Sequence, residues 1–595
     1  MGTISTLRWC CPARTQRRAI SRLRNAPHRF TRDRRGNVAL LFAFMSVPML
    51  MLSGAAIDYG FATRLETKLQ AATDATALLL CQTPATATPA DLNALAQTTM
   101  IGAMGAPNLV VDPLAITSNP RQITLTAHKL STTFFGKLTG TTRINPGATS
   151  QCATPIPKTF EIALVLDNTG SMAASSGGQS KLQAVQQAAT NFVNYVYTNS
   201  SFSSATRISI VPFAGAVAVN PTIYRTASWI DQNGQSSYHW TNVLNASASG
   251  FANRFDIFTK LQSSGVSGWG WGGCLESLPY PLNTQDAAPT SANKDSYFVP
   301  LFAPDEPGDA SNTYRDYNDS SGYWRSYNSY IDDDNSSFLG TCSMNSSLSY
   351  DAALARACKY VNPRNATSST YLGIPSGPNF GCTTQPLLPL TSNQTALKSL
   401  IGNMAPLGST NIFEGLMWGW RTLSPVSVFS SSYASINPAA AAPAAYTTTS
   451  SSSNATAINK IMILMTDGTN SWTANPSAPT GSLYFSAGYF QNANQTSANP
   501  RMPPGQYQNV SDANSARNAL DALTATACAN AKAVNISIYT IGFSVSTDPI
   551  DAAGQTLLKN CASSASQFFI ANTADDLIAA FQKIQSSIGA LRLTQ

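Results

Sequence analysis

The chain has 595 residues, a formal net charge of +7 and only 11% charged residues, and this length excludes a single compact core, so two or more domains are expected. The excess charge is local, because residues 1–35 carry ten arginines against one acid and the residues after Gly36 sum to −2. A basic arm can bind nucleic acid, but the apolar run directly behind it favours a cytosolic segment that orients a membrane helix. We therefore expect no nucleic-acid partner.

The run Val38–Ile57 contains twenty residues and no charge. As a helix it spans about 30 Å, the thickness of the hydrocarbon core of a bilayer. Arginines before the run and few charges after it predict a transmembrane helix over residues 36–58, with the N-terminus in the cytosol. A cleaved signal peptide is the alternative, since Ser53–Ala55 form a small-residue cleavage site, but the long arm and the long apolar run favour a retained anchor.

A small α+β module is predicted over residues 59–152. Apolar and small residues at helical spacing continue the membrane helix as a stalk to about Cys81, and a second short helix is expected at 90–103. Alternating polar and apolar residues then predict two or three strands, over 122–130, 131–138 and 141–148.

Residues 157–590 have a different pattern. Residues 160–167 form a near-continuous apolar run, which is typical of a strand buried in a parallel sheet. Similar runs recur at 207–217, 460–468 and 536–545, with helix-like segments between them. This alternation predicts a doubly wound α/β domain with a mainly parallel sheet.

Three stretches, at about 222–385, 425–457 and 472–511, do not fit the alternation. The first contains four cysteines and many aromatic residues, which predicts a folded, disulfide-stapled insertion. Trp269 and Trp271 are expected in its small core, with a binding face as the alternative. The other two, rich in Ser, Thr and Ala or in Asn, Pro and Ser, are expected to be mobile surface loops.

Eight cysteines follow the apolar run, an even number that indicates disulfides in an exported segment. They are Cys81, Cys152, Cys274, Cys342, Cys358, Cys382, Cys528 and Cys561. The first pairing we expect is Cys528 with Cys561, because one strand and one crossover between them let the chain return to the same side of the sheet. Free thiols are the alternative. Zinc is disfavoured, because no pair has C-x-x-C spacing.

Polar residues follow three of the apolar segments. Asp167, Thr169 and Ser171 come directly after the first strand, Thr410 opens a later helix, and Asp467 ends the strand at 460–468. Ligands bind at the strand ends of a doubly wound sheet, and carboxylate and hydroxyl oxygens suit hard divalent cations. Each fragment alone also fits a turn or a helix cap. All three together, each at the end of an apolar segment, favour a metal site.

These residues resemble the metal-ion-dependent adhesion site (MIDAS) of von Willebrand factor A domains, whose pattern is Asp-x-Ser-x-Ser, a distant Thr and a distant Asp. The resemblance implies a metal set of Asp167, Thr169, Ser171, Thr410 and Asp467, in which Thr169 stands where the family usually has Ser and keeps the hydroxyl. It also implies that the hydroxyls ligate the metal directly, the aspartates directly or through water, and that an acidic side chain of a partner protein completes the shell. Mg²⁺ is the expected cofactor, with Ca²⁺ or Mn²⁺ as alternatives.

The segment from Arg34 to Leu79 looks like the N-terminal part of TadE/TadG-like proteins of the Flp (tight adherence) pilus-assembly system. Many TadG-like proteins join such a segment to a periplasmic A domain, which implies an anchor in a bacterial inner membrane and a periplasmic or surface-facing remainder. Prepilin-type processing needs a glutamate five residues after the cleaved glycine. After Gly36 that position is Leu41, so the anchor is expected to be retained.

Enzyme functions find little support. The sequence has no G-x-x-x-x-G-K-[ST] phosphate loop, no G-x-S-x-G elbow and only three histidines. We expect a non-enzymatic pilus-assembly or adhesion component whose partners are other pilus-assembly or envelope proteins. The alternative is an envelope sensor or scaffold with a metal-dependent A domain unrelated to pili. A hydrolase within 222–385 is a third possibility.

Overall fold

The chain forms two compact units, residues 1–156 and residues 157–595. The computed structural model describes residues 37–83, 87–117, 121–153, 159–176, 178–199, 202–264, 268–307, 317–318, 324–325, 327–331, 350–363, 370–371, 373–446, 458–476, 478, 480–491 and 498–590. The basic arm at 1–35 lies outside the described residues.

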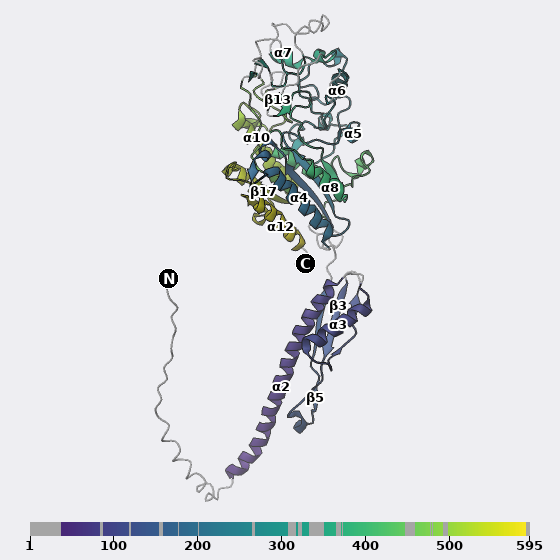
Figure 1. Ribbon diagram of the computed structural model, residues 1–595, viewed down its shortest axis with the longest axis vertical. Helices are drawn as coiled ribbons and strands as arrows, with labels where there is room; N and C mark the ends of the chain where they lie inside the picture. Colours follow the sequence, from purple (N-terminus) through teal and green to yellow (C-terminus); the bar gives the residue numbers. More distant parts are fainter. Residues whose placement is uncertain are drawn as a thin grey trace, which may run out of the picture. The chain divides into compact units, whose positions relative to one another are not determined.

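A single helix, α2 (Asn37–Gln82), runs through the predicted membrane span and to the end of the predicted stalk (Figure 1). Within the described residues it is the one helix long and apolar enough to cross a membrane. Apolar side chains along Val38–Leu52 are exposed, as suits a surface that faces lipid. The hydroxyls of Ser46 and Ser53 donate to carbonyls of the same helix, so these polar groups are satisfied within the span.

The second half of α2 packs against α3 (Pro89–Met104) and an antiparallel sheet. The strands are β1 (Val110–Val111), β2 (Ala115–Thr117), β3 (Gln122–His128) and β6 (Gly147–Ala153), and β3 pairs with each of the others. Every second side chain of β3, from Ile123 to Ala127, is buried, because a sheet with one solvated face alternates in this way. A disulfide between Cys81 and Cys152 joins the end of α2 to β6.

The hairpin after β3 has less β structure than its alternating sequence predicts. β4 (Ser131–Thr132) and β5 (Arg143–Ile144) contribute two residues each, and a 3-10 turn, Gly136–Thr139, lies between them. The strand expected over 131–138 ends early because three successive N–H groups, from Phe134 to Gly136, donate to the carboxylate of Asp58 in α2 at 2.7–2.8 Å.

The second unit is built on one six-stranded sheet (Figure 1). Its order is β15 (Leu388–Thr391), β10 (Arg207–Phe213), β7 (Phe160–Asp167), β16 (Asn459–Thr466), β17 (Ser537–Phe543) and β18 (Phe568–Ala571). Neighbouring strands run parallel, except that β15 is antiparallel to β10. The predicted doubly wound, mainly parallel α/β fold is confirmed.

Helices cover both faces of this sheet. One face carries α4 (Lys181–Thr198), α8 (Gln394–Gly402) and α12 (Ala574–Ala590), and the other carries α9 (Ile412–Leu423), α10 (Ala513–Ala533) and α11 (Ala552–Cys561). In β7, the side chains of Ile162, Leu164 and Leu166 pack in the core beneath α4, α8 and α12. Those of Ala163 and Val165 pack in the core on the opposite face, beneath α9, α10 and α11. Because both faces are buried, the strand reads as an unbroken apolar run.

Residues 214–387, between β10 and β15, contain the predicted insertion. Its described elements include α5 (Pro221–Tyr224), α6 (Arg254–Ser263), α7 (Tyr350–Ala355), the pair β11 (Tyr317–Asn318) and β12 (Trp324–Arg325), and the pair β13 (Thr370–Tyr371) and β14 (Ile374–Pro375). Trp269 and Trp271 are buried in its aromatic core, and a disulfide joins Cys274 to Cys382. The described parts are therefore folded and stapled, as their composition predicts.

The other two unusual segments are packed in the parts that the structure describes, so the expectation of mobile surface loops is wrong for residues 425–446 and for the described residues of 472–511, whereas residues 447–457 lie outside the described residues. Residues 425–446 bury Phe429 and hydrogen-bond to the edge strand β15. Within 472–511, Trp472 stacks on Phe485 with ring centroids 5.0 Å apart, and both are buried. The physical reason is that a few large aromatic side chains bury enough area to order an otherwise polar segment.

The predicted bond between Cys528 and Cys561 is present. Cys528 lies late in α10, and Cys561 is the last residue of α11. The bridge therefore fastens two helices on the same face of the sheet, and both cysteines are buried in the core there.

Candidate functional site

The parallel register brings two predicted site residues to the same end of the sheet. Asp167 is the last residue of β7, and Asp467 follows directly after the neighbouring strand β16. Leu166 pairs with Met465, so Asp167 and Thr466 come next to each other. The hydroxyl of Thr466 donates to Asp167 Oδ2 at 2.6 Å. This carboxyl end of the strands is where doubly wound sheets bind ligands.

Asp167 is fully buried, and both of its carboxylate oxygens accept hydrogen bonds. The N–H of Thr169 donates to Oδ1 at 2.8 Å, and Oδ2 accepts the Thr466 hydroxyl. Burial, and after it the negative charge of Asp467, raises the pKa of Asp167 to about 7. A cation beside this pair would favour the ionised form.

The hydroxyl of Ser171 joins the first loop to Asp467. Its Oγ donates to Asp467 Oδ1 at 2.8 Å and lies 3.0 Å from Oγ1 of Thr169. The loop begins a short 3-10 helix, Gly170–Ala173, right after the strand. The hydroxyls of Thr169 and Ser171, from the loop after β7, therefore lie next to a carboxylate oxygen of Asp467, from the loop after β16.

Thr410 lies in the loop before α9, and backbone hydrogen bonds tie this loop to the first one. The N–H of Leu407 donates to a backbone carbonyl of the loop after β7 at 2.8 Å. In return, the N–H of Gly170, in the loop after β7, donates to the carbonyl of Gly408 at 2.9 Å. Thr410 is buried, and a Cβ built on Gly468 would lie 3.7 Å from its hydroxyl. The structure thus brings all five predicted residues to one end of the sheet.

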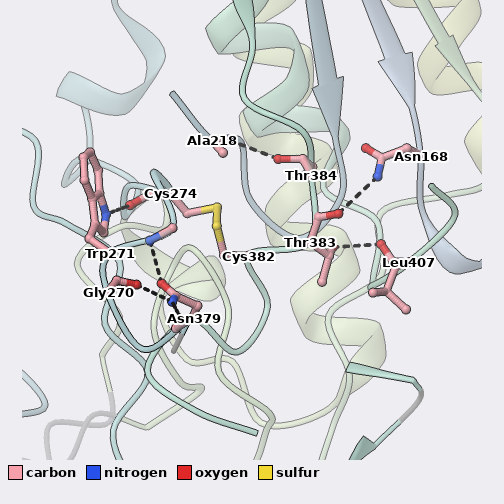
Figure 2. Close-up of a disulfide and its surroundings, with 12 residues drawn as sticks. Asn168, Ala218, Gly270, Trp271, Cys274, Asn379, Cys382, Thr383, Thr384 and Leu407 are labelled. Carbon is pink, nitrogen blue, oxygen red and sulfur yellow. Dashed lines mark hydrogen bonds between the residues drawn. A yellow bond between two sulfur atoms is a disulfide. The ribbon is translucent and has the colours of Figure 1, made fainter. Parts of the chain in front are cut away.

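The base of the insertion supports the Thr410 loop (Figure 2). Cys382 is bonded to Cys274, and the next residue, Thr383, donates its hydroxyl at 2.8 Å to the carbonyl just before Gly408. The side-chain amide of Asn168, in the first loop, reaches the carbonyl of Thr383 at 3.5 Å. Gly408 has φ +94°, and a Cβ there would lie 2.5 Å from the Thr383 hydroxyl, so this close approach needs glycine.

Lys181 is a site residue that the sequence pattern did not single out. It is the first residue of α4, it is fully buried, and its Nζ lies 2.8 Å from Asp467 Oδ2 and 2.7 Å from Asp548 Oδ2. Burial alone lowers the pKa of Lys181, but the two carboxylates outweigh burial and raise it, so the amino group is charged. A lysine in a first helical turn is ordinarily solvated. The one available signal is that no other residue of α4 is charged.

The donor set fits a hard divalent cation. The five predicted residues offer two carboxylates and three hydroxyls, and Asp548 adds a third acid against the single positive charge of Lys181. No group of three or more His, Cys, Asp and Glu side chains that could hold a metal occurs in the described part of the chain. The site would therefore depend on hydroxyls and water as well as two aspartates, which Mg²⁺ accepts.

His239 is the one histidine between residues 222 and 385, where a hydrolase was considered. Its Nδ1 lies 2.8 Å from Asp231 Oδ2, and its Nε2 accepts the N–H of Arg254 at 2.9 Å. Burial lowers the pKa of His239 and keeps the ring neutral. Both ring nitrogens thus hold the insertion together, and neither is free to act as a base.

Comparison with protein families finds one match. Residues 36–79 match the model of the Tad family, described as Flp pilus-assembly TadE/G-like. The resemblance predicted for the N-terminal segment is therefore confirmed. No curated protein sequence matches the chain.

Several pilus proteins are among the similar solved structures. The pilus adhesin SpaC from Lactobacillus rhamnosus GG aligns with 82% of this chain at 11% identity and a TM-score of 0.31, and the chain spans only 35% of the SpaC chain. The vWF domain of the type V pili tip protein Mfa5 from Porphyromonas gingivalis aligns over 74% of this chain and 97% of its own, at 12% identity and a TM-score of 0.29. The adhesive tip pilin GBS104 from Group B Streptococcus agalactiae aligns over 72% and 100%, at 11% identity and a TM-score of 0.31.

Proposed function

We propose that this chain is a non-enzymatic, membrane-anchored component of a pilus-assembly or adhesion apparatus that binds a partner protein through a divalent cation. The match of residues 36–79 to TadE/G-like proteins supports the pilus role. The candidate span in α2 supports the anchor. The arginine-rich segment before it favours a cytosolic N-terminus and two folded units on the periplasmic side of a bacterial inner membrane.

The observation that carries the cation proposal is the meeting of loops that are far apart in the chain. Ser171 and Asp467 are 296 positions apart, yet their side chains are hydrogen-bonded at 2.8 Å. Asp167 lies beside them and is fully buried. Two unit charges about 5 Å apart repel by roughly 3 kcal/mol at an effective dielectric constant near 20. A cation would remove this repulsion, whereas a turn or a helix cap requires no such pair.

The residues that would hold the cation are Asp167, Thr169, Ser171, Thr410 and Asp467. When bound, Mg²⁺ supplies a positive charge with an open position for an acidic side chain of the partner protein. The protein's own contribution is to hold the two carboxylates and three hydroxyls in place. Lys181 balances the charge of Asp467 when no cation is present, and the loop contacts around Gly408 orient Thr410.

Calorimetric titration of the full chain in detergent micelles tests the site. Mg²⁺ and Mn²⁺ are expected to bind the wild-type protein, and Thr410→Val is expected to weaken binding because it removes one hydroxyl and keeps the shape. Thr556→Val is the matched control, since Thr556 is exposed and its hydroxyl donates to the carbonyl of Ala552 in its own helix at 2.7 Å. Absence of binding to the wild-type protein would refute the cation site.

A further inference from the structure

A hairpin in the first unit exposes large apolar side chains. We call residues 130–144 the aromatic hairpin. The exposed fractions of Leu130, Phe134 and Phe135 are 48%, 73% and 43%. On α2, Tyr59 and Phe61 are 70% and 51% exposed. The rings of Phe61 and Phe134 lie 5.7 Å apart, so the two sets form one surface. A clustered apolar surface of this kind marks contact with a partner or a membrane.

The aromatic hairpin is fixed firmly to α2. The buried carboxylate of Asp58 accepts three successive backbone N–H groups, from Phe134 to Gly136, at 2.7–2.8 Å. A Cβ built on Gly54 would lie only 2.7 Å from the Cβ of Phe135, so the hairpin packs directly on the helix backbone. The height of the hairpin along α2 is therefore set by these contacts.

The hairpin contacts α2 at the end of the apolar run Val38–Ile57. Gly54 lies inside the run, Asp58 follows it directly, and Phe61 lies four residues past its end. At 1.5 Å per residue, the contacts extend from about 5 Å inside the end of the run to about 6 Å beyond it. The interfacial layer on each side of a bilayer's hydrocarbon core has a similar thickness, about 5–7 Å.

The charge of the hairpin suits lipid headgroups. Residues 129–147 contain Lys129, Lys137 and Arg143 and no acid, and Lys137 and Arg143 are exposed. Long basic side chains place their charge among phosphates while their stems cover apolar surface. A loop in water gains no stability from exposed aromatic rings that lie beside charged side chains that are all positive.

We propose that the aromatic hairpin lies in the outer interface of the bilayer that α2 spans, with Phe134 and Phe135 among the upper acyl chains and Lys137 and Arg143 against lipid phosphates. The hydrogen bonds from the hairpin backbone to the Asp58 carboxylate hold the turn at this depth in the bilayer. The inference rests on the membrane anchor of the proposed function and is independent of the cation site.

Photo-cross-linking of the full chain in vesicles of phosphatidylethanolamine and phosphatidylglycerol tests the inference. A benzophenone analogue of phenylalanine is placed at Phe134, at Leu50 in the middle of the apolar run, or at Ile101 in α3. Leu50 and Ile101 are both exposed. Ile101 follows Met100, which contacts Thr76, and Thr76 lies about 27 Å along α2 from Asp58. Lipid adducts identified by mass spectrometry are expected at positions 50 and 134 and not at 101.

The outcomes separate the hairpin from the anchor. An adduct at position 50 without one at 134 would overturn the hairpin inference and leave the anchor intact, whereas no adduct at either position would overturn the anchor. Cross-linking of position 134 to a second copy or to another protein would assign the surface to a protein contact instead. The double variant Lys137→Glu, Arg143→Glu is expected to lower the adduct yield at 134 and to leave the yield at 50 unchanged.

Discussion

Lys181 Nζ lies 2.8 Å from Asp467 Oδ2, and both side chains are fully buried. A positive charge therefore already stands behind the aspartate that the proposed cation would use. Lys181 balances one carboxylate when no cation is present, and it opposes the arrival of a second positive charge. These two effects can be separated by experiment.

Replacing the lysine with an apolar residue of similar length, Lys181→Met, is expected to act in opposite directions on stability and on affinity. Without cation, the variant loses about 3 kcal/mol of unfolding free energy, because Asp467 remains buried without its partner. Cation affinity rises about tenfold, or about 1.4 kcal/mol, because a repelling charge is gone. Calorimetry and denaturant unfolding measure both, with Lys559→Met at an exposed position of α11 as the control. Weaker cation binding by Lys181→Met would contradict this role.

A divalent cation is expected to stabilise the second unit. At a free concentration of about 100 times the dissociation constant, a ligand that binds only the folded state adds about 2.7 kcal/mol to the unfolding free energy. Thermal melting of the full chain with Mg²⁺ and then with excess EDTA measures the effect. An unchanged melting temperature after chelation, together with no binding heat, would leave the site without a cation.

Two disulfides of the second unit, Cys528–Cys561 and Cys274–Cys382, are expected to differ in their effect on the site. Removal of Cys528–Cys561 by serine substitution costs about 3–4 kcal/mol of stability in the chain-entropy model but leaves cation affinity unchanged. Removal of Cys274–Cys382 lowers cation affinity as well, because the adjacent Thr383 supports the loop that carries Thr410. Titration of both double variants at a temperature where each is folded decides the matter. Equal affinities would show that the insertion does not position the site.

Acid is expected to destabilise the insertion through His239. Burial lowers the pKa of His239, and Arg254 also opposes protonation, whereas Asp231 and Glu276 favour it without outweighing burial. An unfolded histidine titrates near 6.5, so below about pH 6.5 the unfolded state binds more protons than the folded state. The stability that neutral His239 contributes is therefore present above about pH 6.5 and is lost as the pH falls.

Urea unfolding at about pH 7 and about pH 5 tests this effect. The loss of stability on acidification is expected to be smaller in His239→Gln than in the wild-type protein. An identical loss in both would assign the acid sensitivity to other groups.

The membrane anchor predicts a fixed topology with residue 595 outside the cytosol. The opposite orientation would carry ten arginines across the bilayer. A reporter that is active only in the cytosol, fused behind Gln595, is expected to be silent. Strong activity would reverse the orientation, and a mature N-terminus at Ala56 or Asn37 found by mass spectrometry would show that the anchor is processed.

The central strands were predictable because their side chains are buried on both faces, which leaves an unbroken apolar run in β7 and β16. The proximity of the Asp167 and Asp467 loops was also predictable, because these loops follow parallel strands, which end at one edge of the sheet. Lys181 was not predicted, because the one local signal, the absence of any other charge in α4, does not reveal which partners a buried lysine would meet. Its partners, Asp467 and Asp548, lie 286 and 367 positions away.

Composition misled where a few residues decide the packing. Trp472 and Phe485 order a segment that is otherwise rich in Asn, Pro and Ser. In the aromatic hairpin, alternation predicted a strand, but Asp58 from a distant helix captured the backbone N–H groups that a strand would have paired. Averages over a segment do not register such single contacts.

The strand order also determines when, during synthesis, the central sheet and the proposed cation site can form. β7 lies between β10 and β16, and β16 begins at Asn459. A ribosome that has made residues 157–220 has supplied β7 and one neighbour, but the other neighbour and Asp467 are still hundreds of residues away. Contacts this distant form only after long loops have closed. A chain that ends before residue 459 therefore lacks one of the two strands beside β7 and one of the two aspartates of the proposed cation site, so that site can be complete only after synthesis has passed residue 467.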